Sequence, residues 1–110
     1  MKYGLSAAAI KQIQVVFAKF AAIEKAVLYG SRAKGNHKPG SDIDLTLVGD
    51  ALTPDHLAAI ASALDDLLLP YTIDLSLFHR LNHPDLREHI QRVGVVFYER
   101  QTDGENSQKA

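Results

Sequence analysis

The chain has 110 residues, of which 46% are hydrophobic and 23% are charged, with a formal net charge of −1 and no cysteine. This length suits one compact domain, expected over residues 1–100. The near-neutral charge argues against a general affinity for nucleic acid or anionic membranes, and the absence of cysteine excludes disulfide scaffolds and thiolate metal sites. No apolar run approaches the roughly 20 residues of a membrane span, and the first residues lack a signal-peptide pattern, so a cytoplasmic protein is expected.

The first part of the chain predicts a helix and then a short strand. Ser6 is placed to cap a helix, and the apolar residues that follow recur at helical spacing to about Ala22. AVLY, at residues 26–29, is a β-prone run that stops at a glycine. The apolar stripe of the helix implies a sheet beneath it.

The next segment combines a tight turn with groups that can bind an anion. Gly30 permits a sharp turn off the strand, and Ser31 can cap a short helix that carries Arg32 and Lys34. A helix N-terminus favours a phosphate, so these four residues are candidates for phosphate binding. For the two basic residues, a plain solvated helix face is an equal alternative. The spacing to Gly35 matches the first half of a P-loop, but the Lys and Ser or Thr that should follow are absent.

The middle of the chain predicts a strand, a helix and a second strand. Residues 42–48, DIDLTLV, alternate as a strand does, with Asp42 and Asp44 on the polar face. Residues 53–68 predict a helix that begins with a threonine cap and a proline at its first position. Residues 71–78, YTIDLSLF, repeat the alternation of the earlier strand.

The last elements complete the order αβαβαβαβ. Residues 83–94 predict a final helix, and VVFY at residues 95–98 predicts a final strand. Residues 101–110 have nothing to bury and are expected to form a disordered tail. A doubly wound parallel sheet would show nearly continuous apolar strands, whereas two strands here alternate. The pattern therefore favours a sheet covered by helices on one face and open on the other.

Three carboxylates lie on the polar faces of the two alternating strands. Asp42 and Asp44 project to the same side of one strand and can converge on one cation. Oxygen ligands favour Mg²⁺ or Mn²⁺, and Asp74 on an adjacent strand would complete a site for two ions that aligns a phosphoryl or nucleotidyl transfer. Taken alone, the aspartates are more simply explained as solvated residues of an exposed sheet face, with Asp42 alternatively a turn or cap residue. The neighbouring anion-binding loop shifts the balance toward a metal site.

The segment GSRAKGNHKPGSDID at residues 30–44 resembles the G-S-x10-D-x-D signature of the minimal nucleotidyltransferases of the DNA polymerase β-like superfamily. Asp74 falls where that superfamily often carries a third carboxylate, and the resemblance covers about residues 5–98. It implies a nucleotidyltransferase fold of the α/β (α+β) class: a mixed sheet of about four strands with helices packed on one face.

The resemblance also implies roles for individual residues. Ser31 would contact the triphosphate of ATP or another NTP, Asp42 and Asp44 would hold Mg²⁺, and Asp74 would bind a second ion and help to deprotonate an acceptor hydroxyl. Small proteins of this group often pair with a helical HEPN protein in a hetero-oligomer, and some are antitoxins that transfer AMP from ATP to a tyrosine of that ribonuclease. The rival interpretation is a catalytically silent nucleotide-binding subunit that regulates such a partner by contact alone.

The histidines do not predict a zinc site. The spacings of His79, His83 and His89 fit no strong metal template, and surface or helix-terminus roles are expected for them. His37 lies in the loop before Asp42 and could reach a phosphate, with a solvated loop residue as the alternative.

Overall fold

The structure is a computed structural model and describes residues 1–101. In chain order, the elements are α1 (Ala7–Ala18), β1 (Lys25–Tyr29), α2 (Ser31–Lys34), β2 (Ile43–Val48), α3 (Pro54–Asp65), β3 (Ile73–Leu77), the 3₁₀ helix η1 (Phe78–Arg80), α4 (Pro84–Val93) and β4 (Val95–Glu99). Apart from η1, this is the predicted order. Except for Gln101, the predicted disordered tail lies outside the described residues.

The strands form one mixed sheet in the order β3-β2-β1-β4, as the predicted fold class requires. The pairs β1–β2 and β1–β4 are antiparallel, and β2–β3 is parallel. The crossover through α3 joins the two parallel strands, since parallel neighbours cannot be joined by a tight hairpin. The parallel pairing sets the acidic residues of β2 and β3 side by side.

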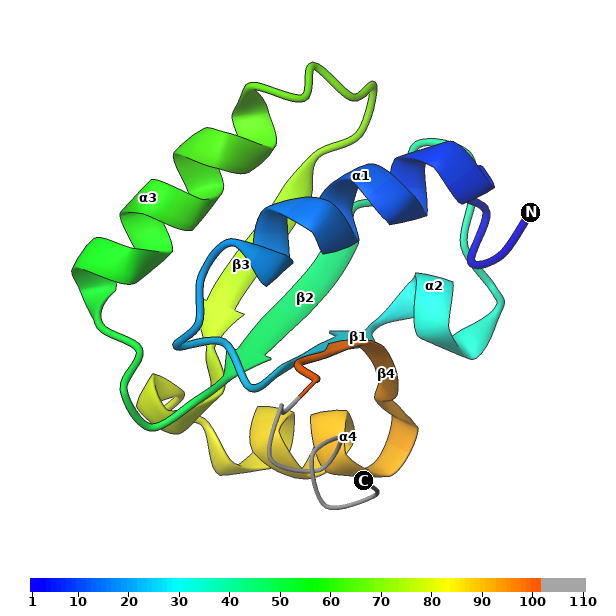
Figure 1. Ribbon diagram of the computed structural model, residues 1–110. Coiled ribbons are helices and arrows are strands. Elements are labelled where there is room, and N and C mark those ends of the chain that lie inside the picture. The colour runs from blue at the N-terminus through cyan, green and yellow to red at the C-terminus, as the bar shows by residue number, and fades with distance from the viewer. Residues whose placement is uncertain (102–110) are drawn as a thin grey trace, which may run out of the picture.

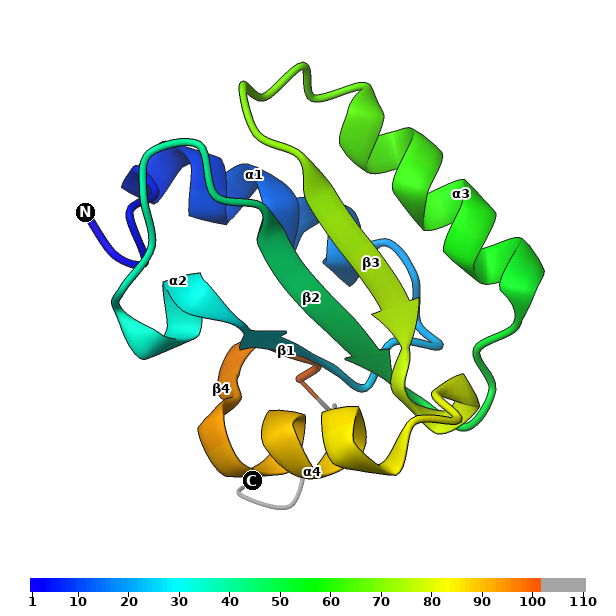
Figure 2. The same ribbon diagram turned by 180° about the vertical axis from the view of Figure 1, so that it is seen from behind.

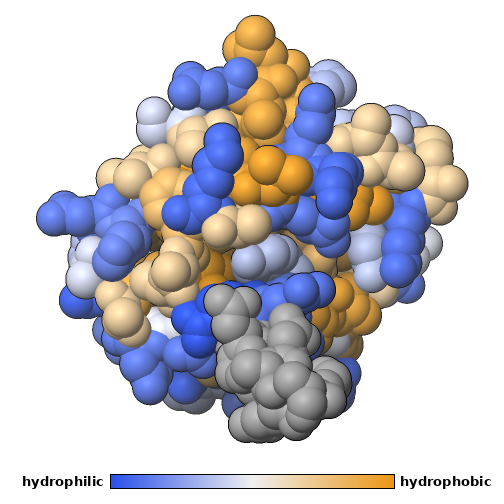
Figure 3. Space-filling view, in the orientation of Figure 1, coloured by the Kyte–Doolittle hydropathy of each residue, from blue (hydrophilic) through white to orange (hydrophobic). Residues whose placement is uncertain are grey.

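Helices α1 and α3 cover one face of the sheet (Figure 1), and the opposite face of β2 and β3 is uncovered (Figure 2). The alternation of the strands explains this arrangement, because the apolar members of β2, Ile43, Leu45 and Leu47, are fully buried in the core beneath the two helices. From the covered side, hydrophobic atoms form patches separated by hydrophilic ones (Figure 3).

Helix α4 packs elsewhere, against β1. A Cβ placed on Gly94, the C-cap of α4, would collide with the side chain of Val27 in β1. Val27 and its neighbour Leu28 point to opposite faces of the sheet, and Leu28 is the one buried in the core. Helix α4 therefore lies against the face opposite α1 and α3, over the β1 side of the sheet. It borders the open face of β2 and β3 without covering it (Figure 2).

Two helices end earlier than their sequence patterns predict. Helix α1 ends at Ala18, not near Ala22, because the chain turns through short-range bonds and returns Ile23 to the core, fully buried. Helix α3 ends at Asp65, and Leu68 then adopts a φ of 55°, which no helix residue does. The predicted caps Ser6 and Thr53 accept bonds from backbone N–H groups of their helices. None of the helices in residues 1–101 is long and apolar enough to cross a membrane.

Candidate active site

The strand register places one row of polar side chains across the uncovered face. Tyr29 of β1 lies opposite Asp44 of β2, and Asp44 lies opposite Asp74 of β3. Directly opposed residues have Cβ atoms about 5 Å apart, so the two carboxylates are immediate neighbours. Asp42 is exposed and directly precedes β2. The structure thus places the three predicted acidic residues on one part of the surface.

The carboxylates act on each other electrostatically. Burial raises the pKa of Asp44 above its ordinary value, and the neighbouring charges of Asp74 and Asp42 raise it further. The positive charge of Arg32 opposes this by lowering the same pKa. Like charges held together disfavour the ionised form, so a cation placed among them would stabilise it.

The arrangement fits a metal ion that arrives with a phosphate ligand. Within residues 1–101, no group of three or more His, Cys, Asp or Glu side chains is arranged to hold a metal ion. The described part of the chain therefore does not present a preformed metal cage. Mg²⁺ is commonly bound through one or two carboxylates together with substrate phosphates and waters, and Asp42 and Asp44 offer oxygen ligands of that kind.

The turn between β1 and α2 passes directly beside Asp44. Gly30 has φ 76° and ψ −157°, a combination open essentially to glycine alone. A Cβ at this position would collide with Oδ2 of Asp44. Gly30, not Ser31 as predicted, is the N-cap of α2, and Ser31 is the first helical residue, so its hydroxyl is not used for capping. The predicted phosphate-binding turn and the carboxylates are adjacent.

The two basic residues of α2 differ in their surroundings. Lys34 is exposed. Arg32 is only 2% exposed and donates hydrogen bonds to the backbone carbonyl oxygens of Tyr3, Pro39 and Ser41, at 2.8–3.4 Å. Direct phosphate binding by Arg32, which the sequence analysis expects, would require these bonds to break. Its observed contacts hold the loop that leads to the carboxylates.

Two of the histidines discussed above, His37 and His83, have local structural contacts. His37 packs over Gly4, where a Cβ would collide with the imidazole ring, and its Nδ1 is buried without a hydrogen-bond partner. His83 caps α4 by accepting a bond from the backbone N–H of Leu86, a helix-terminus role that the sequence predicts.

The sequence patterns do not predict a group of hydroxyl side chains that lies beside the carboxylates on the same face of the sheet. Tyr29 is 8% exposed, and burial raises the pKa of its phenol; the neighbouring Ser76 side chain lowers this pKa, and the charges of Asp74 and Asp44 raise it. The Ser76 hydroxyl donates to Oγ1 of the fully buried Thr46 at 2.9 Å. The sequence signals only that Tyr29 ends a β-prone run, and its place beside Asp44 follows from the strand register alone.

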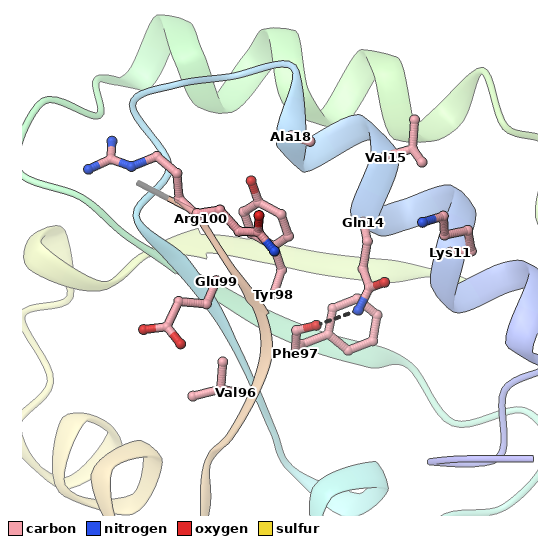
Figure 4. A pocket seen from close by; sticks show the side chains of 10 residues that line it. Lys11, Gln14, Val15, Ala18, Val96, Phe97, Tyr98, Glu99 and Arg100 are labelled. Carbon is pink, nitrogen blue, oxygen red and sulfur yellow. Dashed lines mark hydrogen bonds between the residues drawn. The ribbon is translucent and has the colours of Figure 1, made fainter. Parts of the chain in front are cut away.

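A groove of about 560 Å³ lies away from this site, between α1 and β4 (Figure 4). The Gln14 amide spans it and donates to the backbone oxygen of Phe97 at 2.9 Å. Phe97 itself is buried against Phe17 of α1. The groove contains none of the predicted site residues, so it is separate from the three aspartates.

The sequence model of the family described as polymerase beta, nucleotidyltransferase matches residues 11–103. The chain belongs to this family. The match spans the glycine–serine turn and all three aspartates, and it confirms the family resemblance stated from the motif. No curated protein sequence is similar enough to this chain to count as a match.

Solved structures of complexes share the nucleotidyltransferase fold of this chain. A chain in the crystal structure of a toxin–antitoxin with AMP-PNP is 21% identical, with a TM-score of 0.67 over 87% of this chain and 77% of that one. A chain of the toxin–antitoxin MntA-HepT is 19% identical, with a TM-score of 0.64 over 91% and 78%. A chain from the tri-AMPylated Shewanella oneidensis HEPN toxin in complex with MNT antitoxin is 19% identical, with a TM-score of 0.62 over 89% and 76%. At these identities the likeness shows a common fold.

Proposed function

We propose that this protein is a Mg²⁺-dependent nucleotidyltransferase that transfers AMP from ATP to a hydroxyl group of a HEPN-type partner protein. In this proposal it is the cytoplasmic antitoxin of a toxin–antitoxin pair and forms a hetero-oligomer with that partner. The observation that carries the proposal is the strand register, which sets Asp44 beside Asp74 and against the Gly30 turn in a chain of the nucleotidyltransferase family.

Each polar group has a role in the proposed reaction. Ser31 and Lys34, the first and last residues of α2, bind the triphosphate. Asp42, Asp44 and Asp74 would be the ligands for two divalent ions, Mg²⁺ or Mn²⁺. Bound there, the metal would offset the negative charge of the phosphates and align the attacking and leaving oxygens. The acceptor oxygen attacks the α-phosphorus, pyrophosphate leaves, and the acceptor proton passes to Asp74.

A protein acceptor is consistent with the shape of the site. Asp42 and Asp74 are exposed, and Asp44 is partly buried, on the face that α1 and α3 do not cover. A hydroxyl group on a folded protein can approach such a surface, whereas it could not enter a closed pocket. Two of the similar solved structures are complexes whose descriptions name AMP-PNP or an AMPylated HEPN toxin, which supports both the nucleotide and the partner.

A second candidate function is a silent nucleotide-binding subunit that regulates its partner by contact alone. The two candidates differ in what the carboxylates do. Under the second, inhibition of the partner survives removal of the Asp44 charge.

The test is an intact-mass spectrum of the protein encoded beside this chain's gene, after mixing with this chain and MgATP. Transfer predicts an added AMP mass on the partner that is lost with Asp44→Asn. Asp50→Asn is the matched control, because Asp50 is an exposed carboxylate that follows β2 and is not one of the three predicted site residues. This variant should transfer AMP like the wild type. A stable complex with bound ATP and no added mass would favour the silent subunit.

A further inference from the structure

Arg32 is the largest of the fully buried side chains in the described part of the chain, and it lacks a carboxylate partner there. The one ion pair within residues 1–101 joins Arg92 and Glu88 on the surface of α4. A buried guanidinium is costly unless its N–H groups are hydrogen-bonded. Arg32 satisfies this need with backbone carbonyl groups, and it can do so only while distant segments hold their positions around it.

The first set of contacts joins the N-terminal turn to the loop before β2. Nη1 of Arg32 donates to the carbonyl of Tyr3 at 2.8 Å. Nε and Nη2 donate to the carbonyl of Ser41 at 3.1 and 2.8 Å, and Nη2 also donates to that of Pro39 at 3.4 Å. Ser41 directly precedes Asp42, so the guanidinium fixes the backbone at the point where the first acidic strand begins.

A second contact reaches the segment before β3. The guanidinium lies over the ring of Tyr71, with its Cζ 5.3 Å from the ring centroid. Tyr71 is three residues before Asp74, and the carbonyl of the intervening Thr72 accepts a hydrogen bond from the backbone N–H of Ile43 at 2.9 Å. One side chain therefore touches the entry segments of both strands that carry the acidic residues.

We infer that Arg32 is a positioning residue that ties the N-terminal turn, the loop before Asp42 and the segment before Asp74 into one unit, and so sets the spacing of the carboxylates. The expected effect of Arg32 on catalysis rests on the proposed function, whereas its structural role rests only on the contacts described above. The rigid fork of an arginine can bind several carbonyls at once, whereas the single ammonium of a lysine cannot reproduce that geometry.

The N-terminal turn belongs to this unit. Tyr3 and Gly4 both have positive φ, 59° and 73°, and Lys2 and Leu5 bridge across them. The turn presents the Tyr3 carbonyl to Arg32, and the His37 ring packs over Gly4. For Tyr3 the positive φ is unfavourable, and the surrounding contacts maintain it. Residues distant in sequence from the motif thus help to position it.

The test compares Arg32→Lys with Arg87→Lys. Arg87 is a matched control, because its Nη1 donates to the backbone carbonyls of Phe78 and Leu81 at 2.7 and 3.4 Å and its guanidinium lies over the Phe78 ring, beside α4. The affinity for AMP-PNP in the presence of Mn²⁺, measured by calorimetry, should fall by about 10- to 100-fold in Arg32→Lys, because the loss of a group that orients metal ligands typically has an effect of this size. In the control the affinity should fall by less than twofold. In the transfer assay kcat should fall more than KM rises, since the misplaced carboxylates act in the transition state.

Amide hydrogen exchange, which needs no nucleotide, separates this inference from the proposed function. Arg32→Lys should speed exchange by tenfold or more in residues 2–5, 38–43 and 71–74 together, and Arg87→Lys should not. Tyr71→Leu, which removes only the ring contact, should act in the same direction on residues 71–74. If exchange in those three segments is unchanged in Arg32→Lys, or rises equally in the control, the inference is wrong. If exchange rises as expected but the wild type neither binds the nucleotide nor transfers it, the positioning role stands and the proposed function fails.

Discussion

Replacing Gly30 by alanine should disturb both the backbone and the candidate active site. The φ and ψ of Gly30, 76° and −157°, cost a residue with a side chain about 1–3 kcal/mol. In addition, the new methyl group would collide with Oδ2 of Asp44, so the carboxylate must move. A displacement of about 1 Å in an active site can lower the rate by roughly 100-fold. We therefore expect a less stable protein with at most about 1% of the wild-type transfer rate.

Two other glycines separate these effects. Gly35 also has a positive φ, 84°, but a Cβ there meets no atom within 4 Å, so Gly35→Ala isolates the backbone cost, roughly 1–2 kcal/mol. Gly40 has neither a positive φ nor a Cβ contact, so Gly40→Ala should change stability by less than about 0.5 kcal/mol. Urea unfolding gives the free energies, and mass-spectrometric transfer assays well below the unfolding midpoint give the rates.

The decisive comparison is between Gly30→Ala and Gly35→Ala. Gly35→Ala should lose stability and keep most of its transfer rate, while Gly30→Ala should lose both. If Gly30→Ala transfers AMP as fast as Gly40→Ala, the close approach of the turn to Asp44 has no role in the reaction. If Gly35→Ala loses as much rate as Gly30→Ala, loop strain alone explains the loss and the argument from the Asp44 contact is refuted.

Three further changes test the surroundings of the site. Asp44→Asn should stabilise the metal-free protein at pH 7, because the raised pKa of Asp44 means that its ionised form destabilises the fold. In thermal unfolding this gain in stability should disappear below the ordinary pKa of 3.8, where the wild-type carboxyl is protonated in both the folded and the unfolded state. No gain at pH 7 would contradict the electrostatic argument. Ser76→Ala removes the hydroxyl that donates to Oγ1 of the buried Thr46 and should lower the unfolding free energy by about 1 kcal/mol in urea titrations, and an unchanged value would mean that this bond contributes nothing. Phe17→Ala removes a fully buried ring that packs against Phe97 and should cost about 3–5 kcal/mol, with a loss below 1 kcal/mol refuting its place in the core.

Local patterns predicted much of the architecture because they report on local physics. The alternation in DIDLTLV and YTIDLSLF predicted two half-buried strands, and the described structure has them as β2 and β3. Cap residues predicted where α1 and α3 begin, since a side-chain oxygen bonds its own helix. The helix ends were less predictable, because they depend on tertiary packing. Helix α1 ends at Ala18, and the chain then turns and buries Ile23 in the core.

The motif, its three carboxylates and the strand face that carries Asp44 and Asp74 could be predicted from local pattern alone, because side-chain direction in a strand depends only on position along the chain. Which of these residues lie next to one another depends on the packing of the whole domain. The register that pairs Asp44 with Asp74 and Tyr29 depends on how three strands align, which no single segment encodes. The contacts of Arg32 were equally unpredictable, because nothing in its local sequence indicates that this candidate phosphate-binding residue is buried and donates to the carbonyls of a distant turn and loop. Such contacts form only when the remote segments converge, so they follow from the packed fold and not from any local pattern.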